Sequence, residues 1–313
     1  MHYKHNSSNH ILMVRPASFG FNKDTAVDNK FQNFDEIKNL DNLEEKALSE
    51  FDNYVNYLRE NDLDVVVVDD TPDPYTPDAL FPNNWFTTHK DGRICLYPMK
   101  PLNRRLERRT DVIEMLEMCF HVSEVVDLSK NEENDIFLEG TGSIIFDRVN
   151  KVAFACRSHR TDEALFGDHM ENLGYEPILF DSVDEEGTPI YHTNVMLSIA
   201  SDFVVICGES IPDQKEKELL FEKFRSLEKE IIDVTYEQLK GFTCNVLEVT
   251  NLKGEKTLTM STKAFNAFTD QQKETMSKYV KLLHSSLDTI EIVCGGGSRC
   301  MMAEIYLDEQ LYV

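Results

Sequence analysis

The chain has 313 residues, of which 41% are hydrophobic and 28% are charged, and its formal net charge at pH 7 is −24. This composition is typical of a soluble globular protein, and no apolar run reaches the roughly 18 residues that a membrane span needs. An excess of acidic residues repels phosphate backbones and anionic lipids, so nucleic acids and membranes are poor candidate partners.

The first residues and the cysteines indicate a cellular compartment. The stretch MHYKHNSSNH lacks the apolar segment of a signal peptide, is not Arg-rich like a transit peptide and carries no lipidation signal. The seven cysteines form no CxxC pair and mostly lie in apolar segments such as KVAFAC and DFVVIC. Free thiols pack there as small hydrophobic groups, which argues against disulfides or structural zinc. We therefore expect a cytoplasmic protein.

In chain order, the predicted elements repeat. Four segments share a pattern in which a small or polar turn leads into an apolar strand, a polar or glycine turn and a second strand: residues 83–104, 140–161, 192–212 and 244–265. Their starts are 57, 52 and 52 residues apart, and a fifth start, at GGSRCMMAEIYLD, follows 52 residues later. This last segment breaks off after one strand, and HILMVRPAS at residues 10–18 is predicted to supply the missing one. The two ends of the chain would then meet in one unit.

Between the hairpins the same order recurs, a helix and then a short β-branched strand. Helices with apolar residues at spacings of three and four are predicted at residues 35–61, 104–120, 161–174, 213–230 and 265–287. The strands that follow them are LDVVVVDD, SEVVDL, YEPILFD, IIDVTYE and DTIEIVC. Five such units predict one α/β domain over residues 1–313, folded as a closed, pseudo-fivefold propeller. Closure would leave no sheet edge exposed and would bring the unit starts together around a central axis.

Several chemically distinctive residues stand at these unit starts. Cys300, His192 and the residues around Glu139 and Asn84 precede the first strand of their units, so the symmetry predicts that they gather at one end of the ring. A cysteine is nucleophilic as the thiolate, and a histidine can provide the base that removes its proton. A buried thiol or a satisfied histidine is the ordinary interpretation of each residue alone. Only their convergence favours a catalytic site, suited to attack on a planar, nitrogen-rich carbon.

The combined motifs resemble a known superfamily. The fivefold α/β repeat, LEGTG, a later histidine at a unit start and GGGSRCM resemble the pentein superfamily of guanidine-modifying enzymes. Its members include arginine deiminases, dimethylarginine dimethylaminohydrolases, amidinotransferases and succinylarginine dihydrolases. PDALFPNNWFTTH, SHRTDE and MSTKAFNAF are most similar to the arginine deiminase-related, citrulline-utilising hydrolases. The similarity spans essentially the whole chain and implies a single pentein catalytic domain.

The resemblance implies a role for each catalytic residue. Cys300 matches the nucleophile that forms a covalent adduct through the amidino or ureido carbon of the substrate. His192 resembles the general acid and base, which protonates the leaving amine and then activates water. Glu139 stands where the family has the glutamate that holds the substrate nitrogens.

The resemblance also implies contacts to the amino-acid end of the substrate. Arg160, in SHRT, resembles an arginine that clamps the α-carboxylate in a bidentate pair, and Arg104, in PLNRR, matches a second arginine that helps. Asp78, in PDALF, resembles the residue that meets the α-amino group. Without the resemblance, an exposed surface arginine would be the simpler interpretation of Arg104 and Arg160.

Two departures from the deiminase pattern favour a neutral substrate group. FPNN in place of FTRD puts Asn84, and HTN in place of HLD puts Asn194, where deiminases have guanidinium-binding aspartates. A buried guanidinium needs compensating carboxylates, whereas a ureido group has a carbonyl oxygen and an NH₂ that amides can match. The leading expectation is therefore hydrolysis of citrulline to ornithine, carbon dioxide and ammonia. Glu139 remains as one carboxylate, so a guanidine is disfavoured rather than excluded.

Other functions stay open. The enzymatic alternatives are an arginine or agmatine-type deiminase, a dimethylarginine hydrolase, and an amidinotransferase that passes the group to an amine. An alternative of another class is a non-catalytic amino-acid-binding or structural protein, which would show no selective alkylation of Cys300. The expected partner is a small-molecule amino acid, the chemistry requires no metal or organic cofactor, and the oligomeric state is not readable from the sequence.

Overall fold

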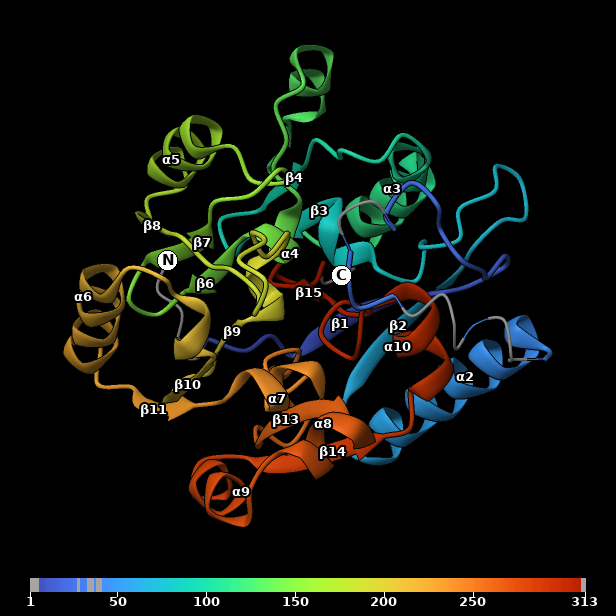
Figure 1. Ribbon diagram of the computed structural model, residues 1–313. Helices are drawn as coiled ribbons and strands as arrows, with labels where there is room; N and C mark the ends of the chain where they lie inside the picture. Colours follow the sequence, from blue (N-terminus) through green and yellow to red (C-terminus); the bar gives the residue numbers. More distant parts are fainter. Residues whose placement is uncertain (1–5, 27–28, 33–36, 38–40, 311–313) are drawn as a thin grey trace.

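The computed structural model describes residues 6–26, 29–32, 37 and 41–310. Its strands form five three-stranded sheets (Figure 1). In each sheet the central strand pairs antiparallel with one neighbour and parallel with the other. A parallel pair needs a crossover connection, and the helices between the hairpins and the third strands supply it. The observed unit is therefore the predicted one of hairpin, helix and strand.

Four sheets take two strands from a hairpin and the third from the end of the crossover, and in the remaining sheet the antiparallel pair comes from the two ends of the chain. In order across each sheet, the strands are β15 (Ala303–Ile305), β1 (His10–Arg15) and β2 (Asp64–Asp69); β3 (Phe86–Thr88), β4 (Arg93–Leu96) and β5 (Glu124–Asp127); β6 (Ile145–Asp147), β7 (Val152–Cys156) and β8 (Glu176–Phe180); β9 (Leu197–Ile199), β10 (Phe203–Ile206) and β11 (Glu230–Asp233); and β12 (Leu247–Thr250), β13 (Lys256–Ser261) and β14 (Lys281–Ser285). The first of these sheets joins the two ends of the chain, as predicted, because β1 pairs with both β15 and β2.

The helices connect and cover these sheets. They are α2 (Leu43–Glu60), α3 (Thr110–Cys119), α4 (Gly140–Ser143), α5 (Glu163–Asn172), α6 (Gln214–Ser226), α7 (Tyr236–Lys240), α8 (Thr262–Ala267), α9 (Asp270–Ser277) and α10 (Asp288–Cys294), with 3₁₀-helices at Pro82–Asn84, Asn103–Glu107, Ser129–Asn134, Thr193–Val195 and Gly208–Ser210. A transmembrane span is absent from the helices of the described chain, because none combines the necessary length with the necessary apolar character.

The last unit differs from the prediction. The helix predicted at residues 265–287 is confirmed only in part, because residues 270–277 form α9 while residues 281–285 form β14. The strand predicted for DTIEIVC is wrong, because residues 288–294 form α10. Most of α10 is buried, so no polar face reveals its helical period. Its N-terminus is stabilised from far away in the sequence, since the N–H groups of Thr289 and Ile290 donate to the Glu50 carboxylate at 2.9 and 3.1 Å.

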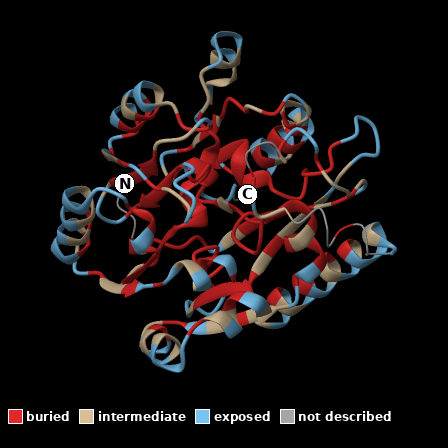
Figure 2. Ribbon diagram, in the orientation of Figure 1, coloured by how far each residue is buried: buried red, intermediate tan, exposed pale blue. Residues whose placement is uncertain are grey.

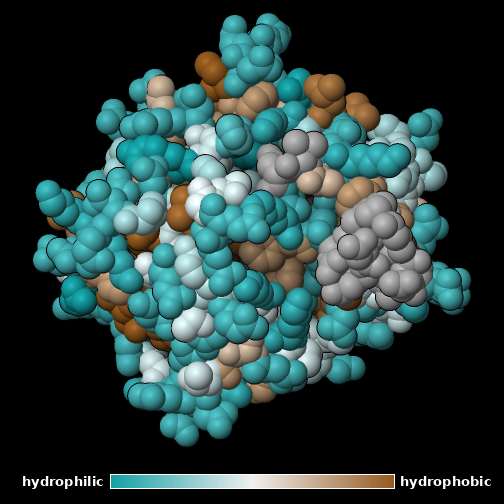
Figure 3. Space-filling view, viewed as in Figure 1, coloured by the Kyte–Doolittle hydropathy of each residue, from teal (hydrophilic) through white to brown (hydrophobic). Residues whose placement is uncertain are grey.

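The hydrophobic core lies between the strands and the peripheral helices. Figure 1 shows α2, α3, α5, α6 and α9 at the outside and most strands nearer the middle, and Figure 2 shows that burial follows the same division. The face seen in Figure 3 is mainly hydrophilic, with apolar side chains visible near its centre. Neighbouring sheets contact through β15 and β3 and through β6 and β9. Hydrogen-bonded ladders do not join one described sheet to the next, so closure into a propeller stays a prediction.

Candidate active site

Cys300 lies in a turn between α10 and β15, at the start of the fifth unit. α10 ends where Gly295 adopts a left-handed backbone with φ of 66°, a conformation that a side chain would strain. The Cys300 N–H then donates to the carbonyl oxygen of Gly297 at 3.1 Å. The Cys300 side chain is 8% exposed. The glycines thus let the chain reverse direction and hold the sulfur just inside the protein.

Two side-chain amides surround the sulfur. Asn194 donates its Nδ2 to Cys300 Sγ at 3.3 Å, and Asn245 donates its Nδ2 at 3.1 Å. Both asparagines are buried and stand shortly before the first strand of their own units. The unit starts therefore do converge here, and Cys300 is positioned by hydrogen bonds rather than by apolar packing alone.

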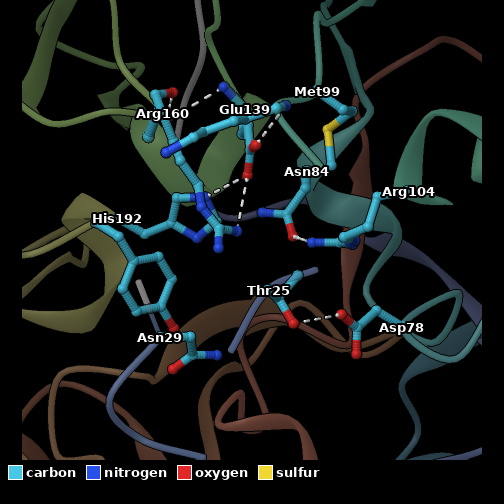
Figure 4. Close-up of polar contacts among 12 residues, drawn as sticks. Thr25, Asn29, Asp78, Asn84, Met99, Arg104, Glu139, Arg160 and His192 are labelled. Atoms are coloured by element: carbon cyan, nitrogen blue, oxygen red, sulfur yellow. Dashed lines mark hydrogen bonds and ion pairs between the residues drawn. The ribbon is translucent and has the colours of Figure 1, made fainter. Parts of the chain in front are cut away.

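A second group centres on the Glu139 carboxylate (Figure 4). Glu139 Oε2 accepts from His192 Nε2 at 2.7 Å and lies 3.4 Å from Arg160 Nη1, while Oε1 accepts from the backbone N–H of Lys100 at 2.9 Å. Burial raises the pKa of Glu139, but the charge of Arg160 and the hydrogen bond from His192 outweigh it and lower this pKa to about 2. Glu139 is therefore ionised at neutral pH although it is fully buried.

This carboxylate determines the state of His192. Burial lowers the pKa of His192, and the contact with Glu139 offsets this only in part. A neutral ring that donates Nε2–H to Glu139 keeps its lone pair on Nδ1, which is the form of a general base. Among the described residues, His192 and Cys300 share no hydrogen bond. The thiol and the histidine are thus separate members of one site rather than a contacting pair.

Gly142 explains part of the LEGTG motif. A Cβ atom on Gly142 would lie 2.3 Å from Asn84 Nδ2 and 2.8 Å from His192 Nδ1. No side chain fits at such distances, so the missing side chain lets an amide and an imidazole approach the same backbone position. The two nitrogens are consequently within about 5 Å of each other.

Arg104 holds Asn84 in one orientation. Arg104 Nη1 donates to Asn84 Oδ1 at 2.7 Å, Nη2 donates to the Phe81 carbonyl oxygen at 3.1 Å, and Nε and Nη2 form an ion pair with Glu107. An arginine cannot accept a hydrogen bond, so the amide oxygen of Asn84 must face Arg104 and its NH₂ must face away. These contacts use most of the N–H groups of Arg104.

Asp78 lies beside the N-terminal segment. Its Oδ2 accepts from Asn22 Nδ2 at 2.6 Å and from Thr25 Oγ1 at 3.3 Å. Its Oδ1 is buried and has no partner of good hydrogen-bond geometry among the described residues, although the Cys294 thiol lies close enough to the carboxylate for Asp78 to raise the pKa of that thiol. An unpaired carboxylate oxygen in the interior is costly, and a cationic ligand would remove that cost.

The two arginines are not on the surface. Arg104 is 3% exposed and Arg160 is 2% exposed, and both form ion pairs with buried glutamates. The interpretation of either residue as an exposed surface arginine is therefore wrong. Burying two guanidinium groups requires partners, and Glu107 and Glu139 provide them.

The sulfur faces a closed space. Cys300 lines a cavity of about 10 Å³, roughly the space of one water molecule. Phe31, Tyr191 and Phe242 are among the residues around it, and the rings of Phe31 and Phe242 lie 5.5 Å apart. An amino acid can therefore reach the sulfur only after residues of this wall move.

The described side chains that could hold a metal ion lie outside the predicted site. Within the described ranges, the group of side chains able to hold a metal ion is His10, Asp64 and Glu309, and none of them is a predicted site residue.

Hydrogen bonds join Cys300 with Asn194, Asn84 with Arg104, and Glu139 with His192 and Arg160, whereas Asp78 bonds with the N-terminal segment. All eight predicted residues are buried, and two further members of these groups were missed. Asn245 stands at the fourth unit start, directly after the residue with which the predicted hairpin begins, so the repeat alone could have identified it. Glu107 sits in a charged stretch, RRLERR, where nothing in the sequence separates it from solvent-exposed neighbours.

Comparison with known proteins places the chain in a family. The sequence model described as eukaryotic N,N-dimethylarginine dimethylhydrolase matches residues 15–307. Curated protein sequences give no significant match. Among solved structures, the N-terminal domain of ArgZ, an arginine dihydrolase from the ornithine–ammonia cycle in Cyanobacteria, has a TM-score of 0.73 and 18% identity over 95% of this chain and 99% of that domain.

Two further structures extend the comparison. AgrE, solved with L-arginine, has a TM-score of 0.73 and 18% identity over 97% of this chain and 41% of its own. This chain likewise spans 41% of full-length ArgZ. A dimethylarginine hydrolase from Pseudomonas aeruginosa, solved with citrulline, has a TM-score of 0.64 and 15% identity over 95% of this chain and 99% of its own. At these identities the structures establish a common fold.

Proposed function

Because this chain belongs to the family of N,N-dimethylarginine dimethylhydrolases, pentein enzymes that hydrolyse C–N bonds, we propose that it converts citrulline to ornithine, carbon dioxide and ammonia. Residues 1–313 act as one catalytic domain, folded as a closed pseudo-fivefold propeller. The reaction takes place in the cytoplasm and uses Cys300 as the nucleophile, with no metal or organic cofactor.

One observation carries the choice of substrate. Asn84 Nδ2 and Asn194 Oδ1 are buried and have no partner within the described part of the chain. Arg104 can only donate, so it must face the oxygen of Asn84, and Asn194 turns its NH₂ toward the sulfur at 3.3 Å. These two amides thus present one unpartnered donor and one unpartnered acceptor within the described chain. A ureido group has a carbonyl oxygen for the first and an NH₂ for the second, whereas a guanidinium has only donors.

The catalytic steps follow from these positions. The thiol proton passes to the neutral His192 through a water molecule, because the two side chains share no hydrogen bond in the described structure. The thiolate attacks the ureido carbon, and His192 returns the proton to the departing ornithine nitrogen. This leaves a carbamoyl group on Cys300. Water, deprotonated by His192, attacks that group, the thiolate leaves, and the carbamic acid released decomposes to carbon dioxide and ammonia.

The amino-acid end of the substrate meets two charged residues. The free Oδ1 of Asp78 accepts from the α-ammonium group, and Arg160 donates to the α-carboxylate. Arg104 supports this end less directly, because Glu107, Phe81 and Asn84 already take most of its donors. We assign to Arg104 the orientation of Asn84 in addition to any contact with the carboxylate.

Arginine is the second candidate substrate. Glu139 keeps an ionised carboxylate in the site, and such a group compensates a guanidinium. Its oxygens are already engaged by Lys100, His192 and Arg160, which leaves less of its charge for a substrate. This favours citrulline over arginine and over methylated arginines.

A product analysis tests the proposal. The purified protein is incubated separately with citrulline, arginine and dimethylarginine, and ornithine, citrulline and ammonia are quantified. We expect ornithine and ammonia from citrulline with the highest kcat/KM, and no turnover by Cys300→Ser, which removes the thiolate with little change in volume. Citrulline accumulating from arginine at a higher kcat/KM would instead identify a deiminase. Absence of any turnover, with Cys300 no more reactive than the buried Cys156, would favour a binding protein.

A further inference from the structure

We propose that Asn245 is a further catalytic residue, whose side-chain NH₂ donates to the Cys300 sulfur and holds it as the attacking thiolate. The inference rests on the proposed function in one respect, that Cys300 is the nucleophile. It adds a residue that neither the sequence motifs nor the resemblance assigns.

The orientation of the Asn245 amide is determined by the backbone. Asn245 Oδ1 accepts from the N–H of Arg299 at 3.0 Å, and Nδ2 then points at Cys300 Sγ at 3.1 Å. A backbone N–H can only donate, so the reverse orientation of the amide would place two donors against each other. The residue that precedes the nucleophile therefore aims the amide at the nucleophile.

Among the described residues, the sulfur has no charged hydrogen-bond partner that would stabilise a thiolate. Thiolates at reactive cysteines are usually stabilised by a nearby cation. Here the cations are occupied elsewhere, since His192 and Arg160 bind Glu139 and Arg104 binds Glu107. In the described chain the hydrogen bonds to Sγ come from Asn194 and Asn245. Hydrogen bonds to a charged acceptor are stronger than those to a neutral one, so both amides favour the thiolate over the thiol.

Asn245 differs from Asn194 in having no capacity left for the substrate. Asn194 Oδ1 is unpartnered in the described structure and can accept from a substrate NH₂. Asn245 uses its oxygen on Arg299 and its nitrogen on Cys300. Loss of Asn245 should therefore lower the reactivity of the sulfur without changing which substrate is preferred.

The surroundings of Asn245 keep it in place. Arg299 is itself held by an ion pair with Glu304 and by the carbonyl oxygen of Met302, both at 3.0 Å. A Cβ on Gly297 would lie 3.0 Å from Asn245 Oδ1. The missing side chain at Gly297, three residues before the nucleophile, therefore leaves room for the amide. Both partners of the Asn245 amide thus belong to one fixed turn.

The isosteric change Asn245→Asp is the main test. One carboxylate oxygen still accepts from Arg299, while the other places a negative charge beside the sulfur in place of a donor. Asn245→Ala removes the donor without adding charge. Asn251→Asp is the matched control, because Asn251 is a buried asparagine on the turn of the same hairpin, and its side-chain hydrogen bonds within the described chain are with Lys253 and Glu255.

Thiol alkylation supplies the measurement. Cys119 is exposed, so all proteins carry Cys119→Ser, and the rate of Cys300 modification by iodoacetamide is followed by peptide mass spectrometry between pH 5 and 10. We expect Asn245→Asp to react at least about tenfold more slowly at pH 7, the scale of one lost charge-assisted hydrogen bond, and its rate profile to move to higher pH. The loss in Asn245→Ala should be smaller. In turnover, kcat should fall while KM stays nearly constant.

One neighbouring group needs a control. A Cβ on Gly297 would also lie 3.0 Å from Glu291 Oε1, so a change in the charge of Glu291 could influence the same region. The profiles are therefore repeated with Glu291→Gln in each protein, and the displacement caused by Asn245→Asp should persist.

The outcomes separate this inference from the proposed function. If Cys300 of the starting protein reacts readily and Asn245→Asp or Asn245→Ala, still folded, gives the same profile, Asn245 has no catalytic role although Cys300 can remain the nucleophile. If Cys300 of the starting protein is no more reactive than Cys156, the nucleophile assignment fails and the inference fails with it.

Discussion

Asn84 selects a ureido oxygen because its own oxygen is taken. Its Oδ1 accepts from Arg104 at 2.7 Å, which leaves Nδ2 facing the site. In Asn84→Asp one oxygen can keep the contact with Arg104 while the other becomes an anionic acceptor, suited to a guanidinium N–H and repelled by a ureido oxygen. We expect the ratio of kcat/KM for citrulline over arginine to fall. The fall should correspond to about 1–3 kcal/mol of transition-state free energy, the cost of one mismatched buried hydrogen bond. Both substrates are measured at one pH, with Asn251→Asp as control. An unchanged ratio in a folded variant would remove substrate selection from Asn84.

The planar guanidinium of Arg160 is the basis of a second prediction about a single residue. Lysine provides a point charge and cannot form a two-pronged contact with a carboxylate. With citrulline, Arg160→Lys should cost about 1.5–3 kcal/mol in kcat/KM, the range of a charge-assisted hydrogen bond. With N-carbamoylputrescine, which lacks the α-carboxylate, the loss should be smaller. Equal losses with both substrates would mean that Arg160 acts through Glu139, from which it lies 3.4 Å away, and not on the carboxylate.

Position 142 requires a glycine because neighbouring side chains leave no room for a Cβ, and not because its backbone conformation favours glycine. A methyl group there would overlap Asn84 Nδ2 at 2.3 Å and press on His192 Nδ1 at 2.8 Å. Gly142→Ala should therefore displace both side chains and lower kcat by about 10²-fold or more, as misplacement of catalytic groups does. Gly167→Ala is the matched control, because nothing lies within 4 Å of a Cβ at that helical glycine. Full activity of folded Gly142→Ala would show that the LEGTG glycine is dispensable.

Among the elements, the N-terminal strap, defined as residues 22–26 and 29–32, covers the site. Asn22 and Thr25 bind Asp78, and Asn29 donates to the Cys294 carbonyl oxygen at 2.9 Å. Figure 4 shows Thr25 and Asn29 close to the catalytic group. The strap binds Oδ2 of Asp78 and leaves Oδ1, the oxygen that we assign to the substrate α-ammonium, without a partner among the described residues. The strap thus orients the Asp78 carboxylate and lies beside the position of the α-ammonium group.

Phe31 allows a test of this covering. It lines the small cavity at Cys300 and packs on Phe242. Phe31→Ala should open the cavity, so that iodoacetamide modifies Cys300 several-fold faster at a fixed pH in the Cys119→Ser protein. Phe265→Ala, which truncates a partly buried ring stacked on His284, should leave that rate unchanged. An unchanged rate in Phe31→Ala would mean that the substrate enters elsewhere.

For the whole molecule, the 52-residue repeat was the strongest signal in the sequence. It predicts the four hairpins and the pairing of β1 with β15, because similar units must bury similar faces. The errors lie where contacts between distant residues outweigh the local sequence pattern. The sequence of α10 predicts a strand, yet the segment is a helix whose N-terminal N–H groups bind the distant Glu50 carboxylate. The same limit applies to the site. Its unit-start residues could be predicted from position, whereas the burial of Arg104 against Glu107 depends on tertiary packing that periodicity does not contain.

The buried carboxyl group of Glu291 makes the stability of the whole protein depend on pH. Neither carboxylate oxygen has a partner of good hydrogen-bond geometry in the described chain. Burial raises the pKa of Glu291 from 4.5 to about 8, and the nearby Ser261 hydroxyl and Lys263 charge offset this only in part. The folded protein therefore keeps the proton up to about pH 8, while the unfolded chain releases it above its ordinary pKa. Over that interval the unfolded state binds fewer protons, so stability falls as pH rises, and the fall ends above the folded pKa.

Glu291→Gln should abolish this component of the pH dependence. We expect the variant to gain stability over the wild type between pH 5 and pH 9, by on the order of 4 kcal/mol across the interval, measured by denaturant unfolding at each pH. Glu50, whose pKa burial also raises, is present in both proteins and cancels in the difference. The exposed Glu237→Gln serves as control and should show no such trend. A constant difference between wild type and Glu291→Gln from pH 5 to pH 9 would mean that Glu291 finds a partner or water in solution and is not kept protonated by the fold.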